Sequence, residues 1–297
     1  MIDKIIVITG PTAIGKTSIS LEIAKAYDGE IINADASQFK RELNIGTAKI
    51  DLNNTDVVHH LIDVINPLDN YNVSDYQKVG RALIEEIKER GHTPIIVGGS
   101  GLYISSLLYD YHFDASGRDD NSELNSLTNE ELMAKLQELD YETSKIIPLN
   151  NRKRLLRAVE VALTGNNISK NRDGNNLLYD AIIICLDTDR SMLYERINKR
   201  VDLMLEDGLI DECKKLIDNG YDLEKIGDIG YKEVGLYLKG TYSYEEMTDK
   251  IKQRTRNYAK RQMTWFRNKL NPIFVSIDYE NTNNTISNIK NIIEGNL

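Results

Sequence analysis

The chain has 297 residues, of which 41 % are hydrophobic and 28 % charged, with a net charge of −9. This is the composition of an ordinary globular protein of one or two domains, and the negative charge alone argues against a nucleic-acid partner. No apolar run approaches the ~18 residues of a membrane span, and the N-terminal stretch has no signal-peptide layout. The only cysteines, Cys185 and Cys213, indicate neither a disulfide framework nor a metal site, so we expect a cytoplasmic protein with no membrane partner.

Five short apolar runs, rich in isoleucine and valine, are bounded by turn signals. Such unbroken runs are typical of strands buried on both faces of a parallel sheet. They cover residues 5–9, 30–34, 94–99, 181–186 and 272–277. Helical patterns lie between them, for example at 18–27 and 75–90. This alternation predicts a three-layer α/β fold, a P-loop NTPase-like parallel sheet flanked by helices.

Residues 113–180 interrupt this alternation. Polar, loop-like stretches occupy 113–131 and 165–176, and helical patterns occupy 131–139 and 152–163. We therefore predict a mostly helical insertion domain at 113–180, within an α/β core made of 1–112 and 181–297. A further block, from 191 to about 270, reads as helices separated by glycine breaks.

The stretch GPTAIGKTS, residues 10–18, follows the first apolar run and matches the phosphate-binding pattern G-x-x-x-x-G-K-[ST]. Backbone N–H groups of such a loop point into one cavity, and the next helix adds the positive end of its dipole. Lys16 would reach the phosphates and the Thr17 hydroxyl would bind Mg²⁺. The motif specifies phosphate and not a base. Asp35, at the end of the second strand, faces the same crevice and could serve a metal or act as a base.

A second glycine-rich loop, GGSGLY at 98–103, joins the third apolar run to the start of a helix. Ser100 could simply cap that helix in a tight turn. Alternatively, its hydroxyl and the neighbouring amides could face the first loop. Two such loops on one sheet edge suggest a site where two ligands meet.

Two segments are strongly basic in spite of the acidic average. Lys250–Lys269 has eight basic residues and no acidic one, and 152–157 adds four more. These segments could be solvated helix faces or a landing surface for an anionic polymer. Trp265 could stack on a base, although a tryptophan at helical spacing is more often part of a core. His59 and His60 are adjacent and therefore point apart, which favours packing over a metal site.

Eight segments then occur in the order found in one family. They are GPTAIGKT, NADASQ with IGTAK, HHLIDV, PIIVGGSGLY, NNRKRLLRAVEV, RINKRVDLMLEDGLIDE, IGYKE and YAKRQMTWFRN. The chain resembles the bacterial tRNA isopentenyltransferase family, the tRNA dimethylallyltransferases, from Lys4 to about Asn268.

The resemblance implies a reaction and its partners. Dimethylallyl diphosphate would donate its five-carbon group to N6 of the adenosine 3′ of the anticodon in tRNA, with Mg²⁺ required and pyrophosphate released. The first glycine loop, often described as ATP-binding in this family, would hold the diphosphate, and the chemistry requires no ATP. The family also implies a monomer that binds the anticodon stem-loop.

By the same resemblance, Asp35, Ser100, Lys16 and Arg200 are the catalytic residues, and Asp35 is the general base. The diphosphate would be bound by Gly10, Pro11, Thr12, Ala13, Ile14, Gly15, Lys16, Thr17, Arg196 and Arg200. The extruded nucleotide and the RNA backbone would be bound by Asp35, Ala36, Ser37, Gln38, Ser100, Asn151, Arg152, Lys153, Arg154 and Leu155. The only expected protein ligand of the metal is Thr17.

The chain departs from the family pattern in one segment, which reads DASQFKRELNIGTAK. Ala36 replaces a serine, Lys40 a tyrosine, Glu42 a glycine and Asn44 an acidic or hydroxyl residue; Ser100 replaces a threonine. These changes bear on tRNA affinity and choice more than on reaction type. A P-loop kinase of a small metabolite and a non-enzymatic tRNA-binding paralogue are the alternative functions.

Overall fold

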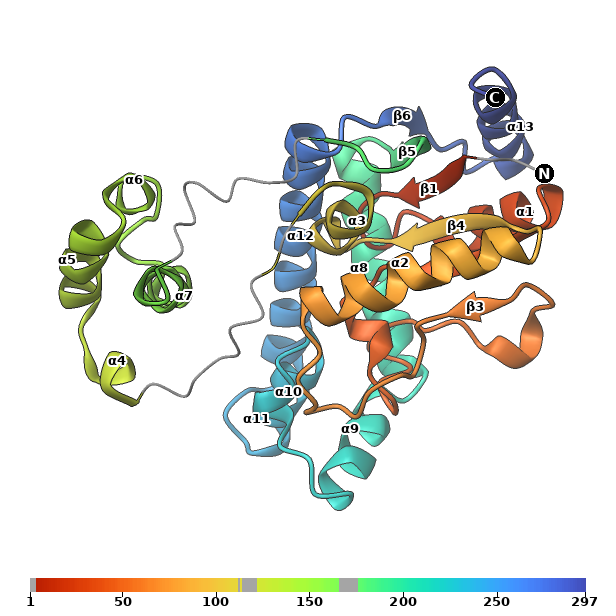
Figure 1. The fold of residues 1–297 in the computed structure, drawn as a ribbon. Helices are drawn as coiled ribbons and strands as arrows, with labels where there is room; N and C mark the ends of the chain where they lie inside the picture. The colour runs from red at the N-terminus through yellow and green to blue at the C-terminus, as the bar shows by residue number, and fades with distance from the viewer. Residues whose placement is uncertain (1–3, 112, 114–121, 166–175) are drawn as a thin grey trace. The chain divides into compact units, whose positions relative to one another are not determined.

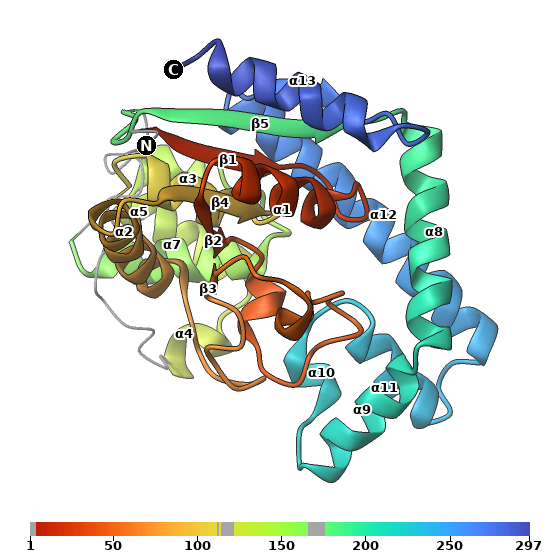
Figure 2. The same ribbon diagram turned by 90° about the vertical axis from the view of Figure 1, so that its right-hand side faces the viewer.

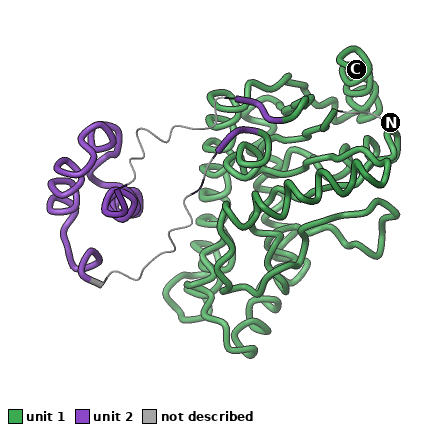
Figure 3. The backbone as a smooth tube through the Cα atoms, in the orientation of Figure 1, with its two compact units in different colours: residues 1–108, 179–297 green, residues 109–178 purple. Residues whose placement is uncertain are grey.

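The structure is a computed structural model that describes residues 4–111, 113, 122–165 and 176–297 (Figure 1). The chain divides into two compact units (Figure 3). The core unit consists of 1–108 and 179–297, drawn in green, and the insertion unit is 109–178, drawn in purple.

The described part of the core unit holds one six-stranded sheet in the order β3-β2-β4-β1-β5-β6, with every neighbouring pair parallel. The strands are β1 (Ile5–Thr9), β2 (Gly29–Asn33), β3 (His59–His60), β4 (Thr93–Gly98), β5 (Ala181–Asp187) and β6 (Ile273–Ser276). The predicted parallel sheet is confirmed, since each of the five apolar runs coincides with a strand to within one residue at either end. β3 was not predicted because two residues carry no readable period.

Helices cover both faces of the sheet (Figures 1 and 2). On one face α1 (Lys16–Ala26) packs with α13 (Thr282–Glu294), and their Ile23 and Ile289 share a buried cluster with Ile6 and Ile184 of the sheet. On the other, α2 (Val73–Glu89) packs with α3 (Gly101–Leu108). Burial on both faces is the reason why the central strands are apolar at every position.

The remainder of the core unit is a helical block. It comprises α8 (Arg190–Glu206), α9 (Leu209–Asp218), α10 (Leu223–Ile226), α11 (Tyr231–Leu238) and α12 (Tyr244–Lys269). The predicted glycine breaks are confirmed: Gly208, at φ 98°, precedes α9, and Gly220, at φ 86°, follows it. These left-handed conformations favour glycine because it has no Cβ.

The insertion unit contains α4 (Ser122–Ser126), α5 (Asn129–Leu139), α6 (Tyr141–Ser144) and α7 (Arg152–Leu163). α5 and α7 pack on each other through buried Leu132, Leu136, Leu155 and Val159. The helical patterns at 131–139 and 152–163 are confirmed, whereas α4 lies in a stretch predicted to be a loop. Residues 114–121 and 166–175 of the predicted polar stretches lie outside the described residues. Within the described ranges no helix is both long and apolar enough to cross a membrane.

Candidate functional site

Three loops meet at the carboxyl edge of the sheet. Thr9 of β1 and Asn33 of β2 pair with Gly98 and Val97 of the intervening β4, so the segments that follow these three strands emerge side by side. The N–H of Ser100 donates to the carbonyl oxygen of Ala34 at 3.0 Å. The sheet therefore brings together the first glycine loop, the Asp35 segment and the second glycine loop, as parallel strands require.

The first glycine loop has the conformation of a phosphate-binding turn. Gly10 lies at φ 146°, and a Cβ there would be 2.8 Å from the carbonyl oxygen of Leu186, so no larger residue fits. Lys16 donates to the carbonyl oxygens of Gly10 and Pro11, at 3.0 Å each. Burial lowers the pKa of Lys16 to about 8. An incoming phosphate would favour the charged ammonium again.

Arg196 and an unpredicted residue, Tyr279, hold the outer side of the same loop. The Nε of Arg196 donates to the carbonyl oxygen of Ala13 at 3.1 Å, and its guanidinium lies 4.0 Å from the centre of the Tyr279 ring. The Tyr279 hydroxyl donates to the carbonyl oxygen of Ile14 at 3.2 Å. This stacked pair fixes the loop and leaves guanidinium donors for an anion.

Asp35 lies directly after β2 and caps a 3-10 helix at Ala36–Phe39, where its carboxylate accepts from the N–H of Ser37 at 3.2 Å. Burial raises the pKa of Asp35, and the charges of Lys16 and Arg200 oppose that rise. A carboxylate whose pKa is raised is a stronger base than an ordinary aspartate, which suits a general base.

Arg200 lies beside Asp35 on the wall formed by α8. One of its terminal nitrogens donates to the carbonyl oxygen of Thr47 at 3.3 Å, and the Gln38 side chain donates to the same oxygen at 3.3 Å. Burial lowers the pKa of Arg200, while Asp35 raises it. The arginine is thus partly desolvated, so its attraction for an anionic ligand is strengthened.

Ser100 serves the Asp35 segment and not only its own turn. Its hydroxyl accepts from the N–H of Ala36 at 3.1 Å and is hydrogen-bonded to Tyr258 of α12, whose pKa burial raises. The hydroxyl therefore fixes the start of the segment in which Asp35 lies. Tyr258 was not predicted as a site residue, since a single tyrosine in a basic helix has no distinctive pattern.

Gln262 of α12 is a second residue that sequence reasoning missed. Its side-chain oxygen accepts from the N–H of Thr12 at 2.9 Å, and its nitrogen donates to the carbonyl oxygen of Gly99 at 2.9 Å. Its side chain is almost fully buried. Gln262 therefore joins the two glycine loops. Tyr258 lies four residues earlier on the same face of α12 and contacts the Asp35 segment indirectly, through Ser100.

Two cavities open on this edge and share Thr12, Asp35 and Arg200. The first chamber, of 390 Å³, is lined by Thr12, Ala13, Gly15, Lys16, Thr17, Asp35, Gln38, Ala48, Arg196, Lys199, Arg200 and Leu203. The second chamber, of 270 Å³, is lined by Thr12, Asp35, Ser37, Gly46, Thr47, Arg200, Val201, Met204, Leu209, Gly227, Asp228, Ile229, Gly230, Ile251, Thr255, Tyr258 and Arg261. The first is cationic and suits phosphates. The second is more mixed, and the shared Asp35 lies where two ligands would meet.

The described residues offer no cluster of three or more His, Cys, Asp or Glu that could hold a metal. An Mg²⁺ ion commonly takes one or two protein ligands and completes its shell with substrate phosphates and water. The exposed Thr17 hydroxyl, in the first chamber with Asp35, fits that kind of site. The Nδ1–H of His59 donates to the carbonyl oxygen of Val57 at 2.8 Å, and His60 contacts Glu30 at 2.6 Å, so the two side chains have separate partners.

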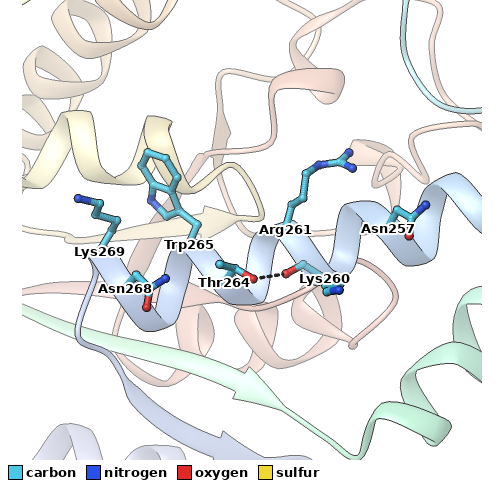
Figure 4. A pocket seen from close by; sticks show the side chains of 7 residues that line it. All are labelled: Asn257, Lys260, Arg261, Thr264, Trp265, Asn268 and Lys269. Atoms are coloured by element: carbon cyan, nitrogen blue, oxygen red, sulfur yellow. Dashed lines mark hydrogen bonds between the residues drawn. The ribbon is translucent and has the colours of Figure 1, made fainter. Parts of the chain in front are cut away.

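The basic α12 divides into two halves with different roles. In the first half Lys252 pairs with Asp202, Arg254 with Glu233, and Arg256 with Asn198. In the second half an open groove of 490 Å³ runs along one helix face (Figure 4), lined by Asn257, Lys260, Arg261, Thr264, Trp265, Asn268 and Lys269. Among the described residues no ion pair is found for the three cations of this groove, so the groove presents free positive charge.

Trp265 is held from one side. Its indole nitrogen donates to the Ser105 hydroxyl at 3.3 Å, and a Cβ on Gly101 would lie 2.2 Å from its ring. Packing against α3 therefore explains its position, while its outer edge lines the groove of α12.

The predicted RNA-binding residues of α7 belong to the insertion unit. Asn151 caps α7 by accepting from the N–H of Arg154, and Arg152 is anchored on the carbonyl oxygens of Asn125 and Leu127 at 2.8 Å. Leu155 is fully buried in the unit's core. Lys153 and Arg154 are exposed, so their side chains are the ones available to a phosphate backbone.

The chain was compared with known proteins. Residues 38–269 match the family model described as IPP transferase. The chain is 44 % identical to the tRNA dimethylallyltransferase of Bacillus cytotoxicus, over 99 % of this chain and 96 % of that protein. It is also 44 % identical to the tRNA dimethylallyltransferase of Streptococcus gordonii, over 98 % and 99 % of the two chains.

Solved structures give the same picture. The tRNA delta(2)-isopentenylpyrophosphate transferase of Staphylococcus epidermidis superimposes with a TM-score of 0.75 at 38 % identity, over the whole of both chains. A eukaryotic dimethylallyltransferase acting on tRNA superimposes with a TM-score of 0.84 at 26 % identity, over 99 % of this chain and 80 % of that one.

Proposed function

The chain belongs to the IPP transferase family, and on that premise we propose that it transfers the dimethylallyl group of dimethylallyl diphosphate to N6 of the adenosine 3′ of the anticodon in tRNA. The observation that carries this function is the meeting of the two chambers at Thr12, Asp35 and Arg200. A phosphate site and a site of mixed polarity then share one partly buried carboxylate, as the transfer of a group between two ligands requires.

In this reaction the bond between the donor's C1 and the diphosphate oxygen breaks, and a bond between C1 and the adenine N6 forms. N6 gives up one proton, and pyrophosphate leaves with the bonding electron pair. Asp35 accepts the proton. Ser100 keeps the Asp35 side chain in place, because its hydroxyl accepts the N–H of the next residue, Ala36. Because Gln262 joins the two glycine loops, the diphosphate donor and the Asp35 carboxylate keep a fixed position relative to each other.

The first chamber binds the diphosphate. Loop amides, Lys16, Arg196 and Arg200 surround it with donors and positive charge, which stabilises the charge that develops on the leaving group. Thr17 would hold an Mg²⁺ ion on the diphosphate, where the ion supplies further neutralisation of charge. No nucleoside triphosphate has a role, so ATP turnover is not expected.

The tRNA is held by positive charge outside the first chamber. The groove on α12 offers Lys260, Arg261 and Lys269, and the exposed face of α7 offers Lys153 and Arg154. Such contacts would bind phosphates and leave base recognition to the second chamber, which the extruded adenosine enters. Ser37 lines that chamber, and Ala36 and Gln38 adjoin it in the chain. We place the reaction in the cytoplasm, where tRNA is processed, and expect a monomer.

The test is label transfer from dimethylallyl diphosphate to unmodified tRNA in the presence of Mg²⁺. The variant Asp35→Asn is expected to lower kcat by about 10²- to 10⁴-fold, the usual contribution of a general base. Asp51→Asn is its matched control, because Asp51 caps another 3-10 helix in the same way but lines neither chamber.

A small-metabolite kinase would instead turn over ATP and ignore tRNA. A non-enzymatic paralogue would bind tRNA and transfer no label with either the natural chain or the variant. Undiminished transfer by Asp35→Asn would keep the reaction and remove Asp35 from the role of base.

A further inference from the structure

Lys40, Asp228 and Ser37 form a compact polar cluster that the reaction as described does not use. The Nζ of Lys40 lies 2.5 Å from one carboxylate oxygen of Asp228, and the Ser37 hydroxyl donates to the other at 2.5 Å. Lys40 also donates to the carbonyl oxygen of Ile226 at 3.0 Å. Both carboxylate oxygens of Asp228 thus have a partner, and Lys40 fixes the turn between α10 and α11 through Ile226 and Asp228.

The cluster forms part of the second chamber. Asp228 and Ser37 line that chamber together with Asp35. Ser37 also donates its backbone N–H to the carboxylate of Asp35 at 3.2 Å. One residue therefore contacts the general base through its backbone and Asp228 through its hydroxyl, so the position of the α10–α11 turn is coupled to the Asp35 segment.

The ion pair is largely withdrawn from solvent. Side-chain exposure is 18 % for Lys40 and 16 % for Asp228. Removing one partner of such a pair leaves an uncompensated charge in a poorly solvated place, whereas replacing both partners with neutral groups is far less damaging. The ion pair therefore fixes the positions of Lys40 and Asp228 more than it adds to the free energy of unfolding.

A neighbouring contact on the same segment lies outside the chamber. Glu42, at φ 64°, accepts from the Asn219 side chain at 2.8 Å and from the Tyr221 hydroxyl at 3.3 Å. Glu42 and its partners line neither chamber. The segment is thus also attached to the helical block at a point that does not face the ligands.

We propose that Lys40 is a positioning residue for the tRNA nucleotide, which holds Asp228 and Ser37 as a fixed wall of the second chamber. Lys40 itself lines neither chamber and acts through Asp228. This inference rests on the proposed function, because it assigns the second chamber to the nucleotide. The wall presents hydrogen-bond acceptors to the N–H and O–H groups of a ribonucleotide and leaves the diphosphate site unaffected.

The experiment measures kcat and the two KM values for Lys40→Met, Lys40→Arg, Asp228→Asn and the double variant Lys40→Met/Asp228→Asn. Lys40→Met is expected to raise the KM for tRNA about tenfold, equivalent to 1.4 kcal/mol. The KM for dimethylallyl diphosphate is expected to stay unchanged. Lys40→Arg retains the positive charge and should stay close to the natural chain.

The double variant should cost no more than Lys40→Met alone, since it carries no unpaired carboxylate. Glu42→Gly is the control, because it removes a contact between the Asp35 segment and the helical block without changing the second chamber. The backbone of Glu42, at a positive φ, suits glycine. Glu42→Gly is expected to leave both KM values unchanged.

Equal rises in both KM values, a loss confined to thermal stability, or the same result with Glu42→Gly would overturn the proposal. Effects of Lys40→Met and Asp228→Asn on the KM for tRNA that simply add in the double variant would also overturn the proposal. Failure of the proposed function can be told from failure of the Lys40 proposal. In the first case the natural chain itself would transfer no label to tRNA.

Discussion

The side-chain nitrogen of Gln262 lies 2.9 Å from the carbonyl oxygen of Gly99, and 163 residues separate them in the chain. The same side chain receives the N–H of Thr12. One amide thus connects the phosphate-binding loop with the loop that carries Ser100. Because α12 also bears the cationic groove, a single helix supports both the catalytic loops and the surface proposed to bind tRNA.

Replacement of Gln262 by leucine should weaken donor binding. The substitution leaves the Thr12 N–H and the Gly99 carbonyl without their partner, at a cost of about 1–3 kcal/mol. We expect the Kd for dimethylallyl diphosphate, measured by calorimetry without tRNA, to rise about tenfold. Gln253→Leu, at an exposed position of the same helix, should leave it unchanged. An unaltered Kd in Gln262→Leu would show that the loops hold their positions without this amide.

Arg196→Ala should impair the first chamber specifically. The change removes a guanidinium that contacts Ala13 and stacks on Tyr279. Loss of a charge-assisted contact is expected to raise the KM for the diphosphate donor about tenfold, with the KM for tRNA preserved. Arg190→Ala is a close match, because Arg190 also stacks on a tyrosine, Tyr194, on the same helix but lines neither chamber. Equal effects of the two variants would contradict a diphosphate role for Arg196.

The pH dependence of kcat/KM should report Asp35. Its pKa is raised above the ordinary value of 3.8 by burial, and a base must be deprotonated to act. Activity is therefore expected to be lost as pH falls through a value above 3.8. Asp228→Asn should shift this acidic limb downwards, because the Asp228 charge raises the pKa of Asp35. Activity regained on return to neutral pH would separate titration from unfolding, and an acidic limb at 3.8 or below would contradict the assignment.

The groove of α12 should bind tRNA by charge. Lys260→Ala is expected to reduce the slope of log affinity against log salt by about one, the effect of losing one phosphate contact. Filter binding at several salt concentrations measures this slope. Lys25→Ala, on the exposed side of α1 and outside the groove, serves as the comparison. An unchanged slope in Lys260→Ala would remove this part of the groove from the tRNA surface.

Both cysteines should resist alkylation in the folded protein. They are buried, and burial raises the pKa of each thiol to about 12. Since the thiolate is the reactive form, iodoacetamide at pH 8 is expected to modify neither Cys185 nor Cys213 until denaturant is added. Mass spectrometry of the intact protein would check this, and rapid labelling of either residue under native conditions would contradict its burial.

Local patterns determined much of this protein. Unbroken apolar runs such as Ile5–Thr9 specified buried parallel strands, and glycines such as Gly208 and Gly220 marked where helices end. The spacing of Gly10, Gly15 and Lys16 specified a phosphate loop, because a tight turn before a helix depends on residues close in sequence. Order of motifs along the chain was sufficient to indicate the family.

Only the tertiary structure decided which side chains meet across long separations. The link from Gln262 to Thr12, the stacking of Tyr279 on Arg196 and the pairing of Lys40 with Asp228 leave no periodic trace in the sequence. The same holds for the charges of the basic segment Lys250–Lys269 in α12. The fold pairs Lys252 and Arg254 with Asp202 and Glu233, but among the described residues it provides no ion pair for the three cations of the groove. Such outcomes depend on where the packed sheet and helices place partner groups, and composition carries no information about that placement.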